Sequence, residues 1–117
     1  TLLPLMITEG FHRRAIAPET IAAVTSRNVA RLYGIPNKGK IEPGFDADLV
    51  VVDPDGERAV DPATLESFSD YSPYESMRLK GWPAATFLRG RLIAEDGAVP
   101  ADVRATPAGR YVARRAA

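Results

Sequence analysis

The stretch GIPNKGK, residues 34–40, separates two parts of the chain whose apolar residues follow different periods. Before it, apolar side chains recur at the three- and four-residue intervals of a helix. After it, short β-branched runs alternate with Pro-Gly and Asp-Gly pairs, which indicates strands joined by turns. Because the period changes only once in 117 residues, the sequence predicts an α+β chain with helices first and strands second.

Residues 34–40 are called the joint below. Three helices are predicted before the joint. Residues 2–11 form an amphipathic pattern in which Pro4 is tolerated because it falls in the first turn. Pro18 stands at a typical first helical position and starts the second helix. Ser26 is a candidate cap for a third, short helix, and Gly34 suits the left-handed conformation that ends helices.

The strands are predicted from residue 40 onward. The unbroken apolar run 49–52 indicates a short strand covered on both faces, closed by a turn at 53–56. Residues 61–76 lack a clear period and are predicted to be an irregular crossing segment. Two further strands flank Arg89-Gly90, Asp96-Gly97 is the next turn, and the tail from Pro100 is expected to run over the surface.

The spacing of Gly34, Gly39 and Lys40 matches a phosphate-binding loop in part. Such a loop needs a strand before it, a helix after it, and a Ser or Thr hydroxyl for the magnesium ion. Here the order is helix then strand, and Ile41 stands where the hydroxyl is required. The glycines are therefore interpreted as a helix cap and a turn, and no cofactor-binding residue is predicted.

Composition narrows the classes of function. Fifteen basic and fifteen acidic residues cancel, which disfavours nucleic acid and anionic membranes as partners. The arginines at 110, 114 and 115 are interpreted as a solvated tail. No cysteine, signal peptide or membrane-length apolar run is present, so a cytoplasmic location is expected. Thr1 lies inside an apolar segment, which suggests a truncated start.

The acids and the single histidine are weak candidates for a site. Asp46 and Asp48 could act as a catalytic pair, but an acid before a buried strand more often fixes the preceding turn. His12 cannot build a histidine-rich metal site alone, and beside two arginines near a helix end it is interpreted as a solvated residue.

Other polar and aromatic side chains carry no recognisable catalytic pattern. The serines Ser67, Ser69 and Ser72 lack a G-x-S-x-G context. The chain has only one histidine, which makes a catalytic triad improbable. Three aromatics lack the basic neighbours of a base-stacking surface and are interpreted as core or interface residues: Tyr71, Tyr74 and Trp82. The sequence therefore predicts no catalytic and no metal-binding residue in this segment.

The order of the segments nevertheless resembles a known family. The elements KGKIEPGFDADLVVVD and DYSPYE…KGWPAATFLRGRLI are similar to the C-terminal end of the cyclic amidohydrolases, which include hydantoinases, dihydropyrimidinases, allantoinases and dihydroorotases. The second element is most similar to the hydantoinase and dihydropyrimidinase branch. Ser76 stands where that branch has glycine, so allantoinase and dihydroorotase remain alternatives.

The resemblance implies a parent enzyme with a (β/α)8 barrel and a small β-sandwich built from both chain ends. Residues 1–39 would be the final barrel helices, 40–99 the C-terminal share of the sandwich, and 100–117 a surface tail. In this family divalent metals, commonly zinc, are held by histidines, an aspartate and a lysine that bridges the two metals. The lysines Lys38, Lys40 and Lys80 lie outside the motif of that bridging lysine. The resemblance therefore implies that the metals are held upstream of Thr1.

The partners implied are the rest of the barrel, a small cyclic amide substrate for the parent, and further copies in a homo-oligomer. Self-association is also expected from the helix 2–11 and from open strand edges. The alternative is a stand-alone, non-catalytic β-rich binding or oligomerisation module derived from the same family.

Overall fold

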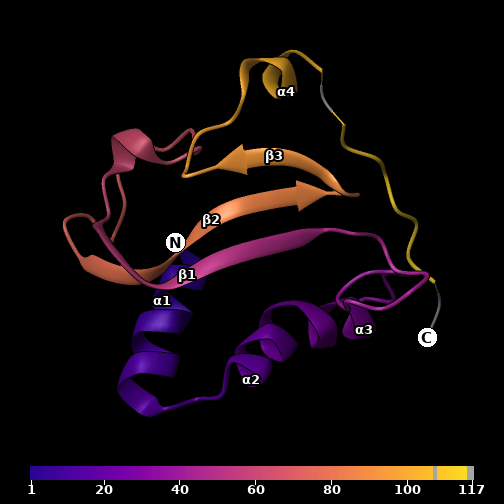
Figure 1. Cartoon of the computed structure of the whole chain (residues 1–117), viewed down its shortest axis with the longest axis horizontal. Coiled ribbons are helices and arrows are strands. Elements are labelled where there is room, and N and C mark those ends of the chain that lie inside the picture. Colours follow the sequence, from indigo (N-terminus) through magenta and orange to yellow (C-terminus); the bar gives the residue numbers. More distant parts are fainter. Residues whose placement is uncertain (107, 116–117) are drawn as a thin grey trace.

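The computed structural model describes residues 1–106 and 108–115. Helices come first and a three-stranded antiparallel sheet follows, which confirms the α+β prediction (Figure 1). The first helical segment is α1 (Leu2–Leu5) continued by the π-helical η1 (Met6–His12). The second joins α2 (Pro18–Ala22), the π-helical η2 (Ala23–Arg27) and α3 (Asn28–Leu32).

The sheet has the order β1-β2-β3, with β1 (Leu49–Ala59), β2 (Arg78–Leu88) and β3 (Arg91–Glu95). Residues 61–76 cross between β1 and β2 and contain the single 3-10 turn η3 (Pro62–Thr64). The tail begins with the short helix α4 (Ala101–Ala105), which the sequence did not predict. Residues 107, 116 and 117 of that tail lie outside the described residues.

The separate third helix capped by Ser26 is wrong. Ser26 lies inside η2, and the helix continues from Pro18 to Leu32 without a break. Serine is only mildly unfavourable within a helix, whereas continuing the helix buries Ala30. Packing therefore outweighs the local preference of serine for a cap.

The left-handed cap predicted at Gly34 is confirmed. Its φ is +62°, and the Ile35 N–H donates to the Ala30 carbonyl at 2.8 Å. The Gly34 N–H donates to the Arg31 carbonyl at 3.2 Å, which completes the two-bond pattern of a Schellman motif. The second helical segment thus ends by local chemistry at the start of the joint.

The turn predicted at 53–56 proved to be an irregularity within a longer strand. The Asp53 carboxylate accepts from the N–H groups of Asp55 and Gly56 at 3.1 and 3.0 Å, as expected for turn chemistry. Pairing with β2 then resumes at Glu57, which lies opposite Lys80. The chain bulges and continues because β2 is long enough to pair with both halves of β1.

The two turns predicted around β3 are confirmed. Arg89 and Gly90 both have positive φ, +48° and +79°, as a two-residue hairpin turn of type I′ requires. Asp96 and Gly97 repeat this combination after β3, with φ of +49° and +84°. Such turns are specified locally, which is why the sequence indicates them.

The buried core is small and draws on both helical segments and on the sheet near the start of β2. Its most enclosed side chains are Ile21, Val60 and Leu79. Ile7 of the first helical segment is also buried. The reason is that Gly81 has no side chain, so β2 approaches Ile7 closely.

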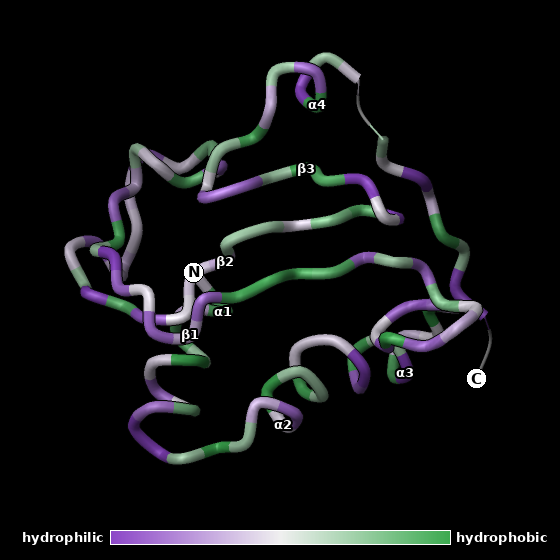
Figure 2. The backbone as a smooth tube through the Cα atoms, viewed as in Figure 1, coloured by the Kyte–Doolittle hydropathy of each residue, from purple (hydrophilic) through white to green (hydrophobic). Residues whose placement is uncertain are grey.

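Much apolar surface stays uncovered. Val50 and Val51 are 49% and 51% exposed, so the prediction of a strand covered on both faces is wrong for this chain by itself. Figure 2 shows the hydrophobic stretch along β1. The accessible surface is 8333 Å². A compact monomer of this mass would expose about 6,200 Å².

Gly81→Ala tests the contact between helix and sheet. Gly81 has a φ of +81°, and an added Cβ would lie 2.3 Å from the Ile7 Cβ. We expect a loss of about 3 kcal/mol in the free energy of unfolding, from left-handed strain and overpacking together. Denaturant unfolding of the protein measures it.

Gly90→Ala is the matched control, because Gly90 has a φ of +79° and no atom within 4 Å of the added Cβ. It should cost only the conformational strain, about 1 kcal/mol. Equal losses for the two variants would show that the contact with Ile7 is not tight.

Candidate functional site

The acids singled out in the sequence form a polar clamp, defined here as Lys38, Asp46, Asp48 and the backbone of Arg89. The Lys38 Nζ lies 2.7 Å from the Asp46 carboxylate and also contacts the carboxylate of Asp48. The other oxygen of Asp48 accepts from the backbone N–H of Arg89 at 2.8 Å. Both Asp48 oxygens therefore have partners within the fold.

The clamp shifts the pKa values of Lys38 and Asp48 in the directions that favour their charged forms. The Lys38 pKa is raised because its ammonium donates to Asp46 and Asp48. Partial burial acts to raise the Asp48 pKa, but the hydrogen bonds from Lys38 and the Arg89 N–H outweigh burial, and the pKa lies below its usual value.

The clamp fastens the joint to the turn between β2 and β3. Beside it, the Gly90 N–H donates to the Ala47 carbonyl at 2.9 Å, and the Asp46 N–H donates to the Asn37 carbonyl at 2.9 Å. This geometry supports the interpretation that Asp46 and Asp48 fix the turn that precedes β1. It also extends that interpretation, since Asp48 holds the later hairpin turn as well as the joint before it.

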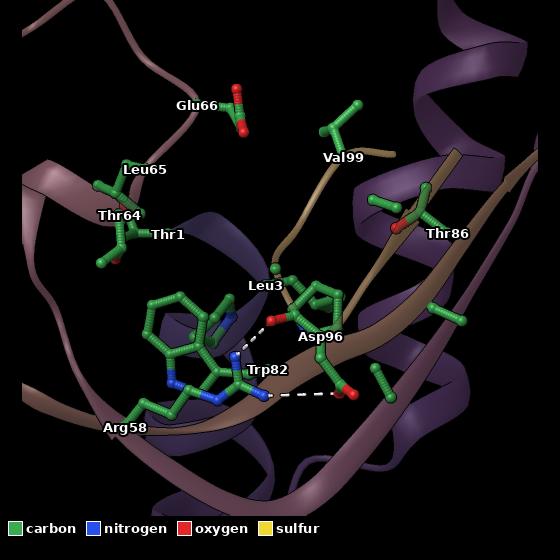
Figure 3. Close-up of a pocket in the computed structure, with 16 residues that line it drawn as sticks. Thr1, Leu3, Arg58, Thr64, Leu65, Glu66, Trp82, Thr86, Asp96 and Val99 are labelled. Atoms are coloured by element: carbon green, nitrogen blue, oxygen red, sulfur yellow. Dashed lines mark hydrogen bonds and ion pairs between the residues drawn. The ribbon is translucent and has the colours of Figure 1, made fainter. Parts of the chain in front are cut away.

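An apolar cleft of about 300 Å³ lies between the start of α1 and the sheet. Figure 3 shows the Arg58 side chain reaching Asp96 next to Trp82. Its guanidinium donates to the Asp96 carbonyl at 3.2 Å, while the Trp82 Nε1–H donates to the Leu79 carbonyl at 2.8 Å. The cleft therefore has a mainly apolar lining, in which the Arg58 and Trp82 donors are already paired.

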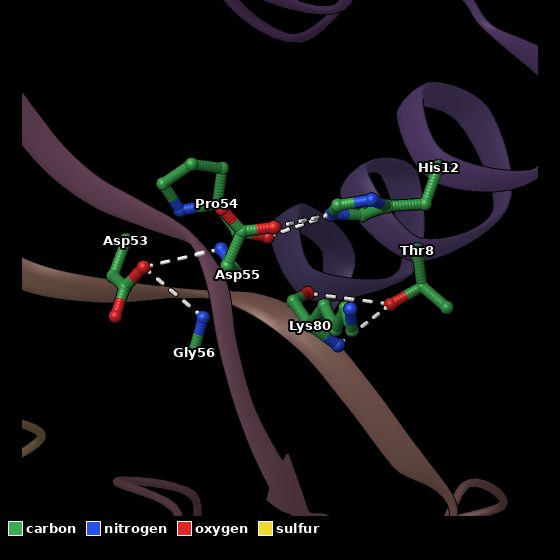
Figure 4. A network of polar contacts seen from close by, with 7 residues as sticks. All are labelled: Thr8, His12, Asp53, Pro54, Asp55, Gly56 and Lys80. Atoms are coloured by element: carbon green, nitrogen blue, oxygen red, sulfur yellow. Dashed lines mark hydrogen bonds and ion pairs between the residues drawn. The ribbon is translucent and has the colours of Figure 1, made fainter.

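His12 is exposed, as the sequence suggested, but its ring also has partners on β1. Its Nε2 donates to the Pro54 carbonyl at 2.7 Å and lies 3.9 Å from the Asp55 carboxylate (Figure 4). One turn earlier, the Thr8 hydroxyl accepts from the Lys80 N–H at 2.8 Å and contacts the Lys80 carbonyl at 3.3 Å. These side chains dock the first helix on β1 and β2.

The remaining candidates have local roles or lie exposed. Ser67 and Ser72 accept from the backbone N–H groups of Ser69 and Tyr74, as serines do in tight turns. Tyr71 is 68% exposed, so its core interpretation is wrong for this chain alone. Its interface interpretation stays a prediction.

Within residues 1–106 and 108–115, no three His, Cys, Asp or Glu side chains gather in a way that could hold a metal ion. In the same part of the chain, no helix has the length and apolar character needed to cross a membrane. The contacts of the joint, the first helix and the sheet form a docking framework.

Comparison with known proteins identifies the family of this chain. Residues 5–93 match the model of the Amidohydrolase family, and the chain belongs to that family. It is 43% identical over 112 residues to an allantoinase of Rubrobacter xylanophilus, which covers 96% of this chain and 24% of the allantoinase. It is 36% identical over 116 residues to an L-hydantoinase of Paenarthrobacter aurescens, covering 98% and 25%.

The fold agrees with that assignment. The solved L-hydantoinase (dihydropyrimidinase) from Arthrobacter aurescens matches with a TM-score of 0.79 and 37% identity, over 84% of this chain and 22% of the other. The chain is thus an amidohydrolase segment related to hydantoinases, dihydropyrimidinases, allantoinase and dihydroorotase. It spans about a quarter of the length of the curated relatives named above.

Asp48→Asn tests the clamp. Asn keeps an acceptor for the Arg89 N–H but loses the charge that Lys38 contacts, so we expect a loss of about 1 kcal/mol of stability near neutral pH. Because the Asp48 pKa is lowered in the folded state, its contribution to stability is complete above the ordinary aspartate pKa of about 3.8 and is lost as the pH falls through the lowered folded-state pKa.

Thermal unfolding of wild type and variant between pH 3 and 7 measures this difference. Asp102→Asn is the control, since Asp102 pairs with Arg91 at 2.9 Å but its side chain is 74% exposed. It should change stability by no more than about 0.5 kcal/mol. A difference for Asp48→Asn that persists unchanged at pH 3 would contradict the ionic clamp.

Proposed function

We propose that this chain is the C-terminal, non-catalytic portion of a metal-dependent amidohydrolase that hydrolyses cyclic amide C–N bonds. The substrates would be of the hydantoin, dihydropyrimidine or allantoin type. In this proposal residues 1–39 are the final helices of a (β/α)8 barrel, 40–99 are the C-terminal share of a β-sandwich, and 100–117 are a surface tail.

The coverage of the relatives is the observation that carries the proposal. Almost the whole chain aligns with the allantoinase and the L-hydantoinase, yet it accounts for only 24% and 25% of their lengths. A segment so similar along its whole length is best explained as the same part of a larger enzyme. The names of these relatives supply the class of substrate.

The uncovered surface supports the same proposal. The chain exposes about 2,100 Å² more than a compact monomer of its mass would. Its radius of gyration is 15.3 Å. About 13.4 Å is typical of 117 residues in one compact domain. Part of this excess surface lies on β1. In the proposed enzyme, the outer edge of β1 would pair with strands from the other chain end.

The residues present do not fit the family's metals. A catalytic zinc needs about three protein ligands with an open position, and among the described residues no such set gathers. His12, Asp46 and Asp48 all have partners within the fold. We therefore assign no step of the reaction to this segment, whose role is to complete and brace the barrel.

The parent would associate as a homo-oligomer. Support comes from large apolar side chains that remain exposed on the second helical segment and the joint: Val24, Leu32, Tyr33 and Ile41. Soluble monomers rarely leave such surface uncovered.

The test is a ring-opening assay on the full-length protein, purified with zinc, cobalt or manganese and compared with a chelator-treated sample. We expect hydrolysis of a hydantoin, a dihydropyrimidine or allantoin that the chelator abolishes. His12→Gln and Asp48→Asn should keep the metal content and the turnover per folded molecule, because neither side chain would touch the metal or the substrate.

Folded, metal-loaded protein that opens none of these rings would contradict the cyclic-amide assignment. Loss of turnover in a normally folded Asp48→Asn protein would contradict the non-catalytic role. An upstream reading frame without metal-binding histidines would favour the stand-alone binding module instead.

A further inference from the structure

The sequence contains two Asp-Gly pairs, at residues 55–56 and 96–97. Aspartate before glycine is prone to isomerise, because glycine has no side chain to hinder its own nitrogen as a nucleophile. The two aspartates are matched in exposure, since the side chains of Asp55 and Asp96 are 79% and 76% exposed. What separates the two pairs is how the fold holds the nitrogen of the glycine.

In the first pair the glycine nitrogen is engaged. The Gly56 N–H donates to the Asp53 carboxylate at 3.0 Å, and the Asp55 N–H donates to the same oxygen at 3.1 Å (Figure 4). Both residues also lie within β1, which pairs with β2 before and after them. Because a hydrogen bond to a charged group must be broken first, attack by the Gly56 nitrogen is slowed.

In the second pair the glycine nitrogen is available. Glu95 and Ala98 exchange two backbone hydrogen bonds, of 3.0 and 2.8 Å, and Asp96 and Gly97 form the two-residue turn between them. None of the hydrogen bonds among residues 1–106 and 108–115 uses the Gly97 N–H. The Gly97 nitrogen can therefore turn toward the Asp96 side chain without losing a bond.

We infer that Asp96 is a site of spontaneous isomerisation to isoaspartate, and that the Asp53 carboxylate protects the equally exposed Asp55. The Gly97 nitrogen gives up its proton and attacks the carboxyl carbon of the Asp96 side chain. The protonated carboxyl group loses its hydroxyl, which leaves with that proton as water, and a five-membered succinimide forms. Water then opens the ring at its main-chain carbonyl, which gives isoaspartate, or at its side-chain carbonyl, which restores aspartate. The mass is unchanged, because one water is released and one is taken up.

Isomerisation changes the wall of the cleft beside α1, because Asp96 and Gly97 both line it. The Asp96 carbonyl that accepts from the Arg58 guanidinium at 3.2 Å becomes part of a free carboxylate (Figure 3). The main chain gains one methylene, which the two-residue turn cannot accommodate without shifting the pairing of Glu95 with Ala98. This chemistry is independent of the reaction proposed for the enzyme.

The test follows both aspartates in one sample. Folded full-length protein is incubated near neutral pH for several weeks and digested with trypsin, and isoaspartate is located by chromatography and fragmentation mass spectrometry. Cleavage after lysine and arginine places the two pairs in different peptides, 41–58 and 92–104. We expect isoaspartate at position 96 to exceed that at position 55 several-fold. In protein incubated in denaturant neither nitrogen is held, so the two positions should react to a similar extent.

Asp53→Ala removes the acceptor of the Gly56 N–H, so it should raise isoaspartate at position 55 several-fold and leave position 96 unchanged. Asp53→Asn keeps an acceptor oxygen and is the matched control. Equal amounts at the two positions in folded wild type, or an unchanged amount at position 55 in folded Asp53→Ala protein, would overturn the inference. So would folded protein without isoaspartate at position 96 whose denatured form accumulates it there. If Asp53→Ala fails to fold, the comparison of folded with denatured wild type decides alone.

Discussion

The fold depends on the close approach of the first helical segment to β2. Gly81 has a left-handed φ and leaves room for Ile7, whose Cβ lies 2.3 Å from where a Gly81 side chain would begin. Beside this contact, the Thr8 hydroxyl bonds to both backbone groups of Lys80. Without this dock Ile7 would lose its burial, and the small core around Leu79 would open.

A second fastening holds the other end of the sheet. The Schellman motif at Gly34 ends the second helical segment, and the clamp around Lys38 and Asp48 then binds the joint to the Arg89 turn. The tail returns to the same place, because the Arg115 N–H donates to the Gly34 carbonyl at 2.8 Å. The helical segments and the joint are therefore held against the sheet at both of its ends.

The sequence predicts the features that local chemistry specifies. Positive φ at Gly34 and Gly90 follows from the residue types that tolerate it, and the helical periods follow from burial on one face. Contacts between distant residues leave no such local signal. Asp48 and Arg89 are 41 positions apart, and the continuation of β1 beyond Asp53 depends on pairing with β2, so neither was predicted.

The unpaired outer edge of β1 gives the most direct test that this chain belongs within a larger enzyme. In an edge strand alternate amides face away from the partner and exchange with solvent, whereas a strand paired on both sides is protected at every residue. Residue-resolved hydrogen exchange in the full-length protein should show unbroken protection from Val50 to Val52. Fast exchange of the amides in this stretch that do not bond to β2 would show that no further strand covers this edge and would contradict the account.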